Sequence, residues 1–392
     1  MKPKAEFSMI VRVGRLGVRA VAHRALALLG CALLSAAPAM AGETRNVVLI
    51  TIDGVRWQEV FSGADPLLLN DKAGCSWQDV ELLKKDYWRE GPRERRKLLM
   101  PFLWSTIASQ GQIFGNKALG SHAHVTNPHH FSYPGYNEMA TGAPDPRIDR
   151  NEYGQNPHQT VFEWLNGLPE LSGQVEIFGG WRAFHDIFNP ARSHLPVRAG
   201  KTLVDPADTS PRGQLLLELY QRTTRLDGDD PLDSFLYEAV KDHLEAHQPR
   251  VLFVGFGDTD NWAHAGRYDA LLETIHNVDW FIGRLWAQMQ SMPQYRGTTT
   301  FIVTTDHGRG SGPVEWKEHG VEQKGSDNVW IAVLGPDTPA LGERRGIVPV
   351  TQAQIAATVA ALLGKDFRAA APKAAPPIAD VLGPARAVAG AH

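Results

Sequence analysis

Seven side chains of this 392-residue sequence have the types and order to form two adjacent metal sites around one hydroxyl nucleophile: Asp53, Ser132, Asp260, His264, Asp306, His307 and His319. Carboxylate and imidazole ligands without a thiolate are typical of catalytic Zn²⁺, and they also suit Mn²⁺. Two such cations about 4 Å apart can stabilise both the attacking and the leaving oxygen of an in-line displacement. The residue types therefore indicate metal-assisted ester chemistry.

The spacing of the ligands divides them into two sets. One set is Asp260, His264 and His319, and the other is Asp53, Asp306 and His307. Asp260 and His264 are four residues apart, so one helical turn brings both to one side, where His319 can arrive from a later loop. Asp258 is a rival ligand, but the Asp-x-x-x-His spacing favours Asp260. The first set leaves a coordination position open, as catalytic zinc requires.

Ser132 is the predicted nucleophile. A serine hydroxyl is a poor nucleophile at neutral pH, and a coordinating divalent cation is one of the few ways to populate its alkoxide. Activation by a metal would explain why no Gly-x-Ser-x-Gly elbow surrounds it. A loop-rich stretch after this serine is predicted from Pro134, Gly135, Gly142, Pro144 and Pro146.

Each predicted carboxylate ligand follows a strand. NVVLITI from Asn46 stops at Asp53, VLFVGFG from Val251 leads into the Asp260 segment, and TTTFIVTT from Thr298 leads into Asp306. These apolar runs are typical of parallel strands that are buried on both faces. Open α/β sheets bind their ligands at the carboxyl ends of such strands.

Helical patterns alternate with the strands. Helices are predicted at Thr160–Leu168, Ser234–His247, Tyr268–Met292 and Gln352–Leu363, and a further strand at Val329–Leu334. The sequence thus predicts the α/β class, as a three-layer αβα sandwich with a mostly parallel central sheet. Because 43% of the residues are hydrophobic and no linker or repeat interrupts the chain, we expect one domain over residues 42–392.

Residues 1–41 have the organisation of a secretory signal peptide. Basic residues precede an apolar segment, Ala25–Pro38, which is followed by Ala39-Met40-Ala41 as an A-x-A cleavage site. The apolar segment is shorter than the roughly 20 residues of a spanning helix, so a retained anchor is the weaker interpretation, and no transmembrane segment is expected in the mature chain. We expect export to the periplasm or secretion, with a lipid anchor through Cys31 as the minor alternative.

Charge and cysteine content limit the partners. The leader holds six basic residues and one acidic residue, so the remainder, with 34 Lys and Arg against 42 Asp and Glu, has a formal charge of −8. An acidic surface disfavours a nucleic-acid backbone as the main partner, although bound divalent metals would offset the charge locally. Cys75 is the single cysteine after the leader, which excludes an intramolecular disulfide.

The motif pattern resembles the alkaline phosphatase superfamily, and within it the nucleotide pyrophosphatase/phosphodiesterase branch. Phosphodiesterases of that branch carry Thr or Ser followed by aromatic-Pro, with Thr-Gly nine residues after the nucleophile; Ser132-Tyr133-Pro134 and Thr141-Gly142 match. The resemblance spans roughly Asn46 to Gly364 and implies an alkaline-phosphatase-like fold. It also implies two Zn²⁺, one held by Asp260, His264 and His319, the other by Asp53, Asp306, His307 and Ser132.

Departures from the superfamily patterns narrow the expected substrate. Tyr136 stands where sulfatases have the Arg of C/S-x-P-x-R, so Ser132 should remain a serine. Trp181-Arg182-Ala183 occupies the region where some phosphomonoesterases place a Lys-x-Arg pair. Asn151 resembles the family's Asn that donates to a phosphoryl oxygen. The resemblance therefore favours hydrolysis of a small-molecule phosphodiester through a phosphoserine intermediate. The alternatives are a phosphomonoesterase, a phosphoryl transferase or mutase, and a sulfatase-like hydrolase. A non-catalytic binding protein is the last alternative.

Overall fold

The structure is a computed structural model that describes residues 44–224, 228 and 230–383. The predicted signal peptide, its cleavage site and Cys31 lie outside these residues. Within the described ranges, no helix is both long enough and apolar enough to cross a membrane. Cys75 is buried and unoxidised.

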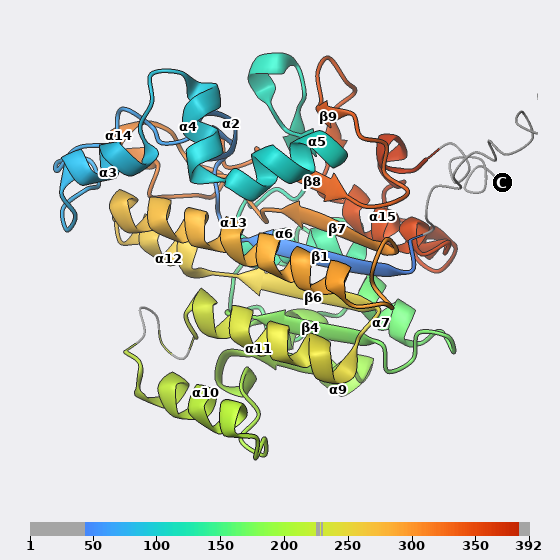
Figure 1. Ribbon diagram of the computed structural model, residues 1–392. Helices are drawn as coiled ribbons and strands as arrows, with labels where there is room; N and C mark the ends of the chain where they lie inside the picture. The colour runs from blue at the N-terminus through green and yellow to red at the C-terminus, as the bar shows by residue number, and fades with distance from the viewer. Residues whose placement is uncertain (1–43, 225–227, 229, 384–392) are drawn as a thin grey trace, which may run out of the picture. The chain divides into compact units, whose positions relative to one another are not determined.

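An eight-stranded sheet forms the centre of the fold, with strand order β5-β4-β6-β1-β7-β8-β2-β9 (Figure 1). The strands are β1 (Asn46–Ile52), β2 (Gln112–Phe114), β4 (Val175–Gly179), β5 (Val197–Ala199), β6 (Val251–Phe256), β7 (Thr299–Thr304), β8 (Ile331–Leu334) and β9 (Gly342–Glu343). Of these, β8 pairs antiparallel with both β7 and β2, and the other neighbouring pairs are parallel. A separate two-stranded ladder joins β3 (Ala123–His124) to β10 (Val350–Thr351).

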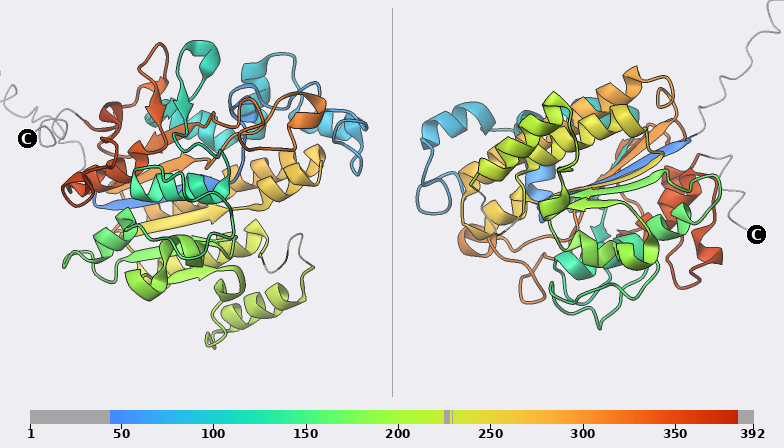
Figure 2. Two further views of the ribbon diagram at one scale, coloured as in Figure 1. Left: turned by 180° about the vertical axis from the view of Figure 1, so that it is seen from behind. Right: turned by 90° about the horizontal axis from the view of Figure 1, so that it is seen from below.

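Helices cover both faces of this sheet (Figure 2). The α-helices are α2 (Trp57–Ser62), α3 (Val80–Tyr87), α4 (Pro92–Leu99), α5 (Ala108–Gln110), α6 (Ser132–Thr141), α7 (Val161–Asn166), α8 (Phe184–Phe188), α9 (Pro190–Ser193), α10 (Pro211–Arg222), α11 (Asp233–His247), α12 (Asp258–His264), α13 (Tyr268–Ser291), α14 (Gly312–Glu315) and α15 (Gln354–Leu362). Helices α11 and α13 lie over one face, and α6, α7 and α15 over the other. This arrangement confirms the predicted αβα sandwich with a mostly parallel sheet.

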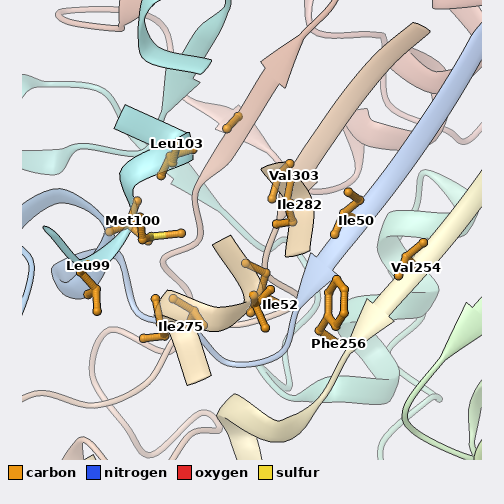
Figure 3. Close-up of a cluster of buried hydrophobic side chains, with 14 of the residues drawn as sticks. Ile50, Ile52, Leu99, Met100, Leu103, Val254, Phe256, Ile275, Ile282 and Val303 are labelled. Atoms are coloured by element: carbon orange, nitrogen blue, oxygen red, sulfur yellow. The ribbon is translucent and has the colours of Figure 1, made fainter. Parts of the chain in front are cut away.

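The alternation of side chains along β1 divides the hydrophobic core between the two faces. Val48, Ile50 and Ile52 belong to the cluster that contains the buried face of α13, whereas Val47 and Leu49 pack with side chains of α6, α7 and α15. Figure 3 shows the first of these clusters, including Ile50 and Ile52. Because β1 is covered on both sides, both of its faces carry mainly apolar side chains, which explains why a run of β-branched and apolar residues predicted it.

The predicted strand at Asn46 has the observed bounds, and the four predicted helices match α7, α11, α13 and α15 within two residues at either end. The loop-rich stretch predicted after Ser132 is wrong over residues 132–141, which form α6, whereas residues 142–160 contain no helix or strand. Pro134 lies in the first turn, where its missing N–H has no intrahelical partner to lose. Gly135 lets the helix approach Asp306, whose carbonyl oxygen would lie 2.5 Å from a Cβ at this position. Gly142 ends the helix at φ 77°.

Candidate metal centre

The three central strands of the sheet, β6, β1 and β7, end level with one another. Ile52 on β1 pairs with Phe256 on β6, and Thr51 pairs with Thr304 on β7. The backbone N–H of Asp53 continues the ladder by donating to the Phe256 carbonyl at 3.0 Å. Residues just beyond these ends, although far apart in sequence, therefore meet at the carboxyl edge of the sheet.

The first group of candidate ligands is Asp260, His264 and His319. Asp260 and His264 lie one turn apart on α12, with the His264 Nε2 3.3 Å from Asp260 Oδ2. The Nε2 atoms of His264 and His319 are 3.0 Å apart, and His319 Nε2 is 3.8 Å from Asp260 Oδ1. Burial lowers the pKa of both imidazoles and the neighbouring His307 lowers both further, although Glu318 opposes this at His264; the lowered pKa favours the neutral form that can bind a metal.

The second group gathers around His307. Its Nε2 lies 3.3 Å from Asp53 Oδ1, 3.4 Å from Asp306 Oδ2 and 3.8 Å from Asp260 Oδ1. Its Nδ1 donates to the Gly308 carbonyl at 2.9 Å, which leaves Nε2 as the metal-facing nitrogen. Asp260 therefore adjoins both groups. In this part of the site, Asp53, Asp260 and His307 have ligand atoms that all lie within 4.8 Å of one another, whereas the predicted set contained Asp306 in place of Asp260.

The carboxylates of this centre have oxygen atoms that the protein leaves unsatisfied. Asp53 Oδ1 and Asp306 Oδ2 are buried, and neither has a hydrogen-bond partner among the described residues. A buried carboxylate oxygen without a partner costs free energy that a bound cation would offset. The donor set of carboxylates and imidazoles suits Zn²⁺ or Mn²⁺, so the residues fit the predicted pair of metal ions.

The metal-free centre holds protons that a cation must displace. Burial and the charge of Asp53 raise the pKa of Asp306 to about 7. Burial alone would lower the pKa of His307, but the carboxylates of Asp306 and Asp53 outweigh it and raise the value to about 9.

We therefore expect binding of a divalent metal at pH 7 to release protons, because His307 is protonated below its pKa and must lose its proton to become a ligand. For each proton displaced, the apparent affinity should fall about tenfold per pH unit below the pKa. Calorimetric titration of the metal-free protein in two buffers with different ionisation enthalpies measures the number of protons released. Equal binding enthalpies in the two buffers would contradict the protonated state of the centre.

Ser132 is the first residue of α6, and its side chain is buried beside the second group. Its Oγ lies 3.3 Å from His307 Nε2. Glu138, on the same helix, accepts hydrogen bonds from the backbone N–H groups of Thr126, Asn127 and Ala353. These bonds fix the helix against its neighbouring segments. The amino end of α6, which carries a partial positive charge, thus faces the centre with the hydroxyl at its tip.

A pocket of about 400 Å³ opens over these residues. It is lined by Asp53, Ser132, Asn151, Gly180, Trp181, Asp230, Pro231, Gly257, Asp258, Asp260, Asn261, His264, Ala265 and His319. The Oδ1 of Asn151 accepts from the Tyr133 N–H at 3.1 Å, which leaves the Nδ2 as a donor to the pocket. The rival ligand Asp258 belongs to neither group, since its Oδ2 accepts from the Asp233 N–H at 2.8 Å.

Several residues that form hydrogen bonds with the predicted ligands or their backbone were not predicted from the sequence. The Tyr136 hydroxyl donates to Asp53 Oδ2 at 3.0 Å, and the Thr259 hydroxyl donates to the Asp53 carbonyl at 2.6 Å. Gln352 donates to the carbonyls of Thr305 and Asp306. Such partners orient a ligand. The signal for Tyr136 was its place in the motif around Ser132; nothing local to Thr259 or Gln352 marks them.

The sequence matches a family described as type I phosphodiesterase / nucleotide pyrophosphatase over residues 73–328. This range contains all the predicted site residues except Asp53. A search of curated proteins finds no match.

Solved structures show the same fold at low sequence identity. Alkaline phosphatase PafA has 10% identity and a TM-score of 0.54, over 87% of this chain and 99% of that one. The phosphonate monoester hydrolase SpPMH from Silicibacter pomeroyi has 13% identity and a TM-score of 0.53, over 86% and 76%. The lipoteichoic acid synthase LtaP from Listeria monocytogenes has 12% identity and a TM-score of 0.51, over 83% and 73%. The alkaline-phosphatase-like fold is thereby confirmed.

Proposed function

This chain belongs to the type I phosphodiesterase / nucleotide pyrophosphatase family of the alkaline phosphatase superfamily, and from that premise we propose that it hydrolyses phosphate diesters of small molecules at a two-zinc centre. The resemblance drawn from the motifs is confirmed by this membership. One observation favours diesters: among the described residues, no Lys or Arg lines the pocket over Ser132.

The charge of the substrate explains why that observation matters. At neutral pH a phosphate diester carries one negative charge, whereas a monoester carries nearly two. A pocket without cationic side chains gives the second charge no partner beyond the metal centre itself. Arg182, in the region where some phosphomonoesterases have their Lys-x-Arg pair, has an exposed side chain outside the pocket lining, and its backbone N–H donates to Asp230 at 3.0 Å.

In the proposed centre, Asp260, His264 and His319 would hold one zinc, and Asp53, Asp306 and His307 would hold the other together with Ser132. When bound, the two cations would lower the pKa of the serine hydroxyl and neutralise charge on the attacking and leaving oxygens. Asp260 adjoins both groups and is able to serve either one.

The chain's own residues would carry out two displacements. The Ser132 Oγ attacks phosphorus in line, an Oγ–P bond forms, and the bond from phosphorus to one alcohol oxygen breaks as that alcohol leaves. Water then attacks phosphorus from the side that the alcohol left, the Oγ–P bond breaks, and a proton from the water returns to the Ser132 Oγ, which releases the phosphate monoester. The Asn151 Nδ2 would donate to a non-bridging phosphoryl oxygen, and the partial positive charge at the amino end of α6 would stabilise the same oxygen.

Hydrolysis of bis-nitrophenyl phosphate against nitrophenyl phosphate, by protein beginning at Gly42 and before and after chelation, tests the proposal. We expect two zincs per chain and faster cleavage of the diester, lost on chelation and restored by Zn²⁺. Faster monoester cleavage would make the protein a phosphatase, and faster cleavage of nitrophenyl sulfate would make it a sulfatase-like hydrolase. A phosphorylated product from an added alcohol would identify a transferase. Absence of both metal and turnover would reject the site.

Replacing Asn151 with aspartate should lower kcat for the diester by about 10²-fold or more, because loss of one donor to a developing oxyanion has an effect of this size. Aspartate keeps an acceptor for the Tyr133 N–H, and it replaces the donor by a negatively charged oxygen that repels the phosphoryl group. Steady-state kinetics with a zinc determination on the same sample measures the effect. An unchanged kcat at full zinc content would remove Asn151 from the site.

We also propose that the chain is exported to the periplasm or secreted after cleavage behind Ala41. Amino-terminal sequencing of the exported protein should begin at Gly42. A mature terminus at a lipid-modified Cys31 would favour the lipid anchor instead.

A further inference from the structure

Arg309 directly follows Asp306, His307 and Gly308, and the reaction described above does not use it. Its side chain is only 2% exposed. Three nitrogens of the guanidinium are engaged: Nε donates to the Gly54 carbonyl at 3.2 Å, Nη1 to the Lys317 carbonyl at 2.6 Å, and Nη2 to the Asp260 carbonyl at 3.4 Å. Nη2 also forms an ion pair with Asp260 Oδ1.

Each of these contacts reaches a segment that carries a predicted ligand. Gly54 is adjacent to Asp53, Lys317 lies two residues before His319, and Asp260 is itself a ligand. Arg309 thus joins its own segment, with Asp306 and His307, to three others. A planar guanidinium with a fixed fork of donors can hold several carbonyls at once, whereas the single ammonium of lysine cannot reproduce this geometry.

We propose that Arg309 is a positioning residue that joins the four ligand-bearing segments and orients Asp260 toward His264 and His319. The inference rests on the proposed metal centre. Because it acts through Asp260, its loss should weaken chiefly the zinc held by Asp260, His264 and His319.

The electrostatics of the centre agree with this role. Asp53, Asp260 and Asp306 are three carboxylates that approach one His307 nitrogen within 3.8 Å. Their mutual repulsion favours rotation of Asp260, the most exposed of the three, away from the cluster. A guanidinium paired with Asp260 Oδ1 opposes that rotation and leaves Oδ2 facing His264, 3.3 Å away.

Gly54 provides an independent way to disturb the same contact. Its φ is +61°, and a Cβ there would lie 2.8 Å from Arg309 Nε and 2.9 Å from Asp260 Oδ1. Gly54→Ala would therefore press on the pair of Arg309 and Asp260 while leaving every ligand and the arginine in the sequence.

The test compares zinc binding by Arg309→Met, Arg309→Lys and Gly54→Ala with that of the wild type, in chelator-buffered zinc and by metal content per chain. Arg96→Met is the matched control, since Arg96 is also buried but pairs with Glu343 and contacts no ligand segment. We expect Arg309→Met to lose about 10- to 100-fold in affinity for one zinc and to retain the other, as is usual when a partner of a metal ligand is removed. Arg309→Lys should show a smaller loss at the same site. Gly54→Ala should weaken that site and also the other one, because the Gly54 N–H donates to Asp306 Oδ1 at 3.0 Å. Arg96→Met should bind both zincs as the wild type does.

The Co²⁺-substituted proteins give a readout independent of activity. The visible spectrum of the more weakly bound cobalt should change in Arg309→Met and stay unchanged in Arg96→Met. If Arg309→Met does not fold, Arg309→Lys and Gly54→Ala carry the test. If the folded variants bind two zincs with wild-type affinity, the inference about Arg309 is wrong and the proposed function is unaffected. If the wild-type protein binds no zinc, the proposed function is rejected as well.

Discussion

Ser132→Ala is expected to lower kcat for diester hydrolysis by at least about 10³-fold while the protein keeps its zinc, because the variant lacks the oxygen that attacks phosphorus. The serine would contribute only one ligand atom to the second zinc, and Asp53, Asp306 and His307 would remain to hold that zinc in the variant. Ser132 is the first residue of α6 and is buried, so alanine fits its place without a clash. The measurement is steady-state kinetics together with zinc content on the same preparation.

Ser132→Thr is the matched control, since it keeps a hydroxyl at the same position, and it should retain far more activity than the alanine variant. Mass spectrometry of acid-quenched enzyme should detect a phosphorylated peptide containing residue 132 in the wild type and none in Ser132→Ala. Wild-type turnover by a zinc-loaded Ser132→Ala would reject the covalent step.

Among substitutions at the buried predicted ligands, Asp53→Asn is expected to cause the largest loss of zinc affinity. The Tyr136 hydroxyl donates to Asp53 Oδ2, and an asparagine oxygen can accept the same bond. Oδ1, which faces His307 at 3.3 Å, loses its negative charge. Removing a partner of a ligand costs about 10- to 100-fold in metal affinity, so removing a charged ligand should cost more than about 100-fold. The zinc-dependent gain in unfolding free energy should then shrink by about 2.7 kcal/mol or more.

Thermal unfolding with and without excess zinc measures this gain. Asp279→Asn is the control, because Asp279 is also buried but accepts from the N–H groups of Phe102 and Leu103, away from the centre. It should destabilise both forms alike and leave the difference between them unchanged. A wild-type zinc-dependent gain in Asp53→Asn would show that Asp53 is not a ligand.

Local sequence information was sufficient for the strands that deliver the ligands. A continuous apolar run predicted β1 over residues 46–52, and the position of Asp53 directly after it followed from the strand's end. The helical spacing of Asp260 and His264 likewise needs only one turn of α12. These features depend on residues that are close in the sequence, so they can be predicted from the sequence alone.

The supporting residues depend on distant segments and could not be predicted in this way. Arg309 donates to a carbonyl 255 residues earlier, and Tyr136 to a carboxylate 83 residues earlier. The glycine and proline after Ser132 predicted a loop because their usual local effect is to break a helix. In the fold, Gly135 instead allows α6 to approach the Asp306 backbone, a contact that local propensity does not report.

The central place of β1 has a consequence for biosynthesis. Its neighbours β6 and β7 both come much later in the chain, so a ribosome must complete the sequence through Thr304 before β1 is paired on both sides. Until then this apolar strand has an open edge, the kind of surface that promotes aggregation. We therefore expect chains truncated before Thr299 to be insoluble.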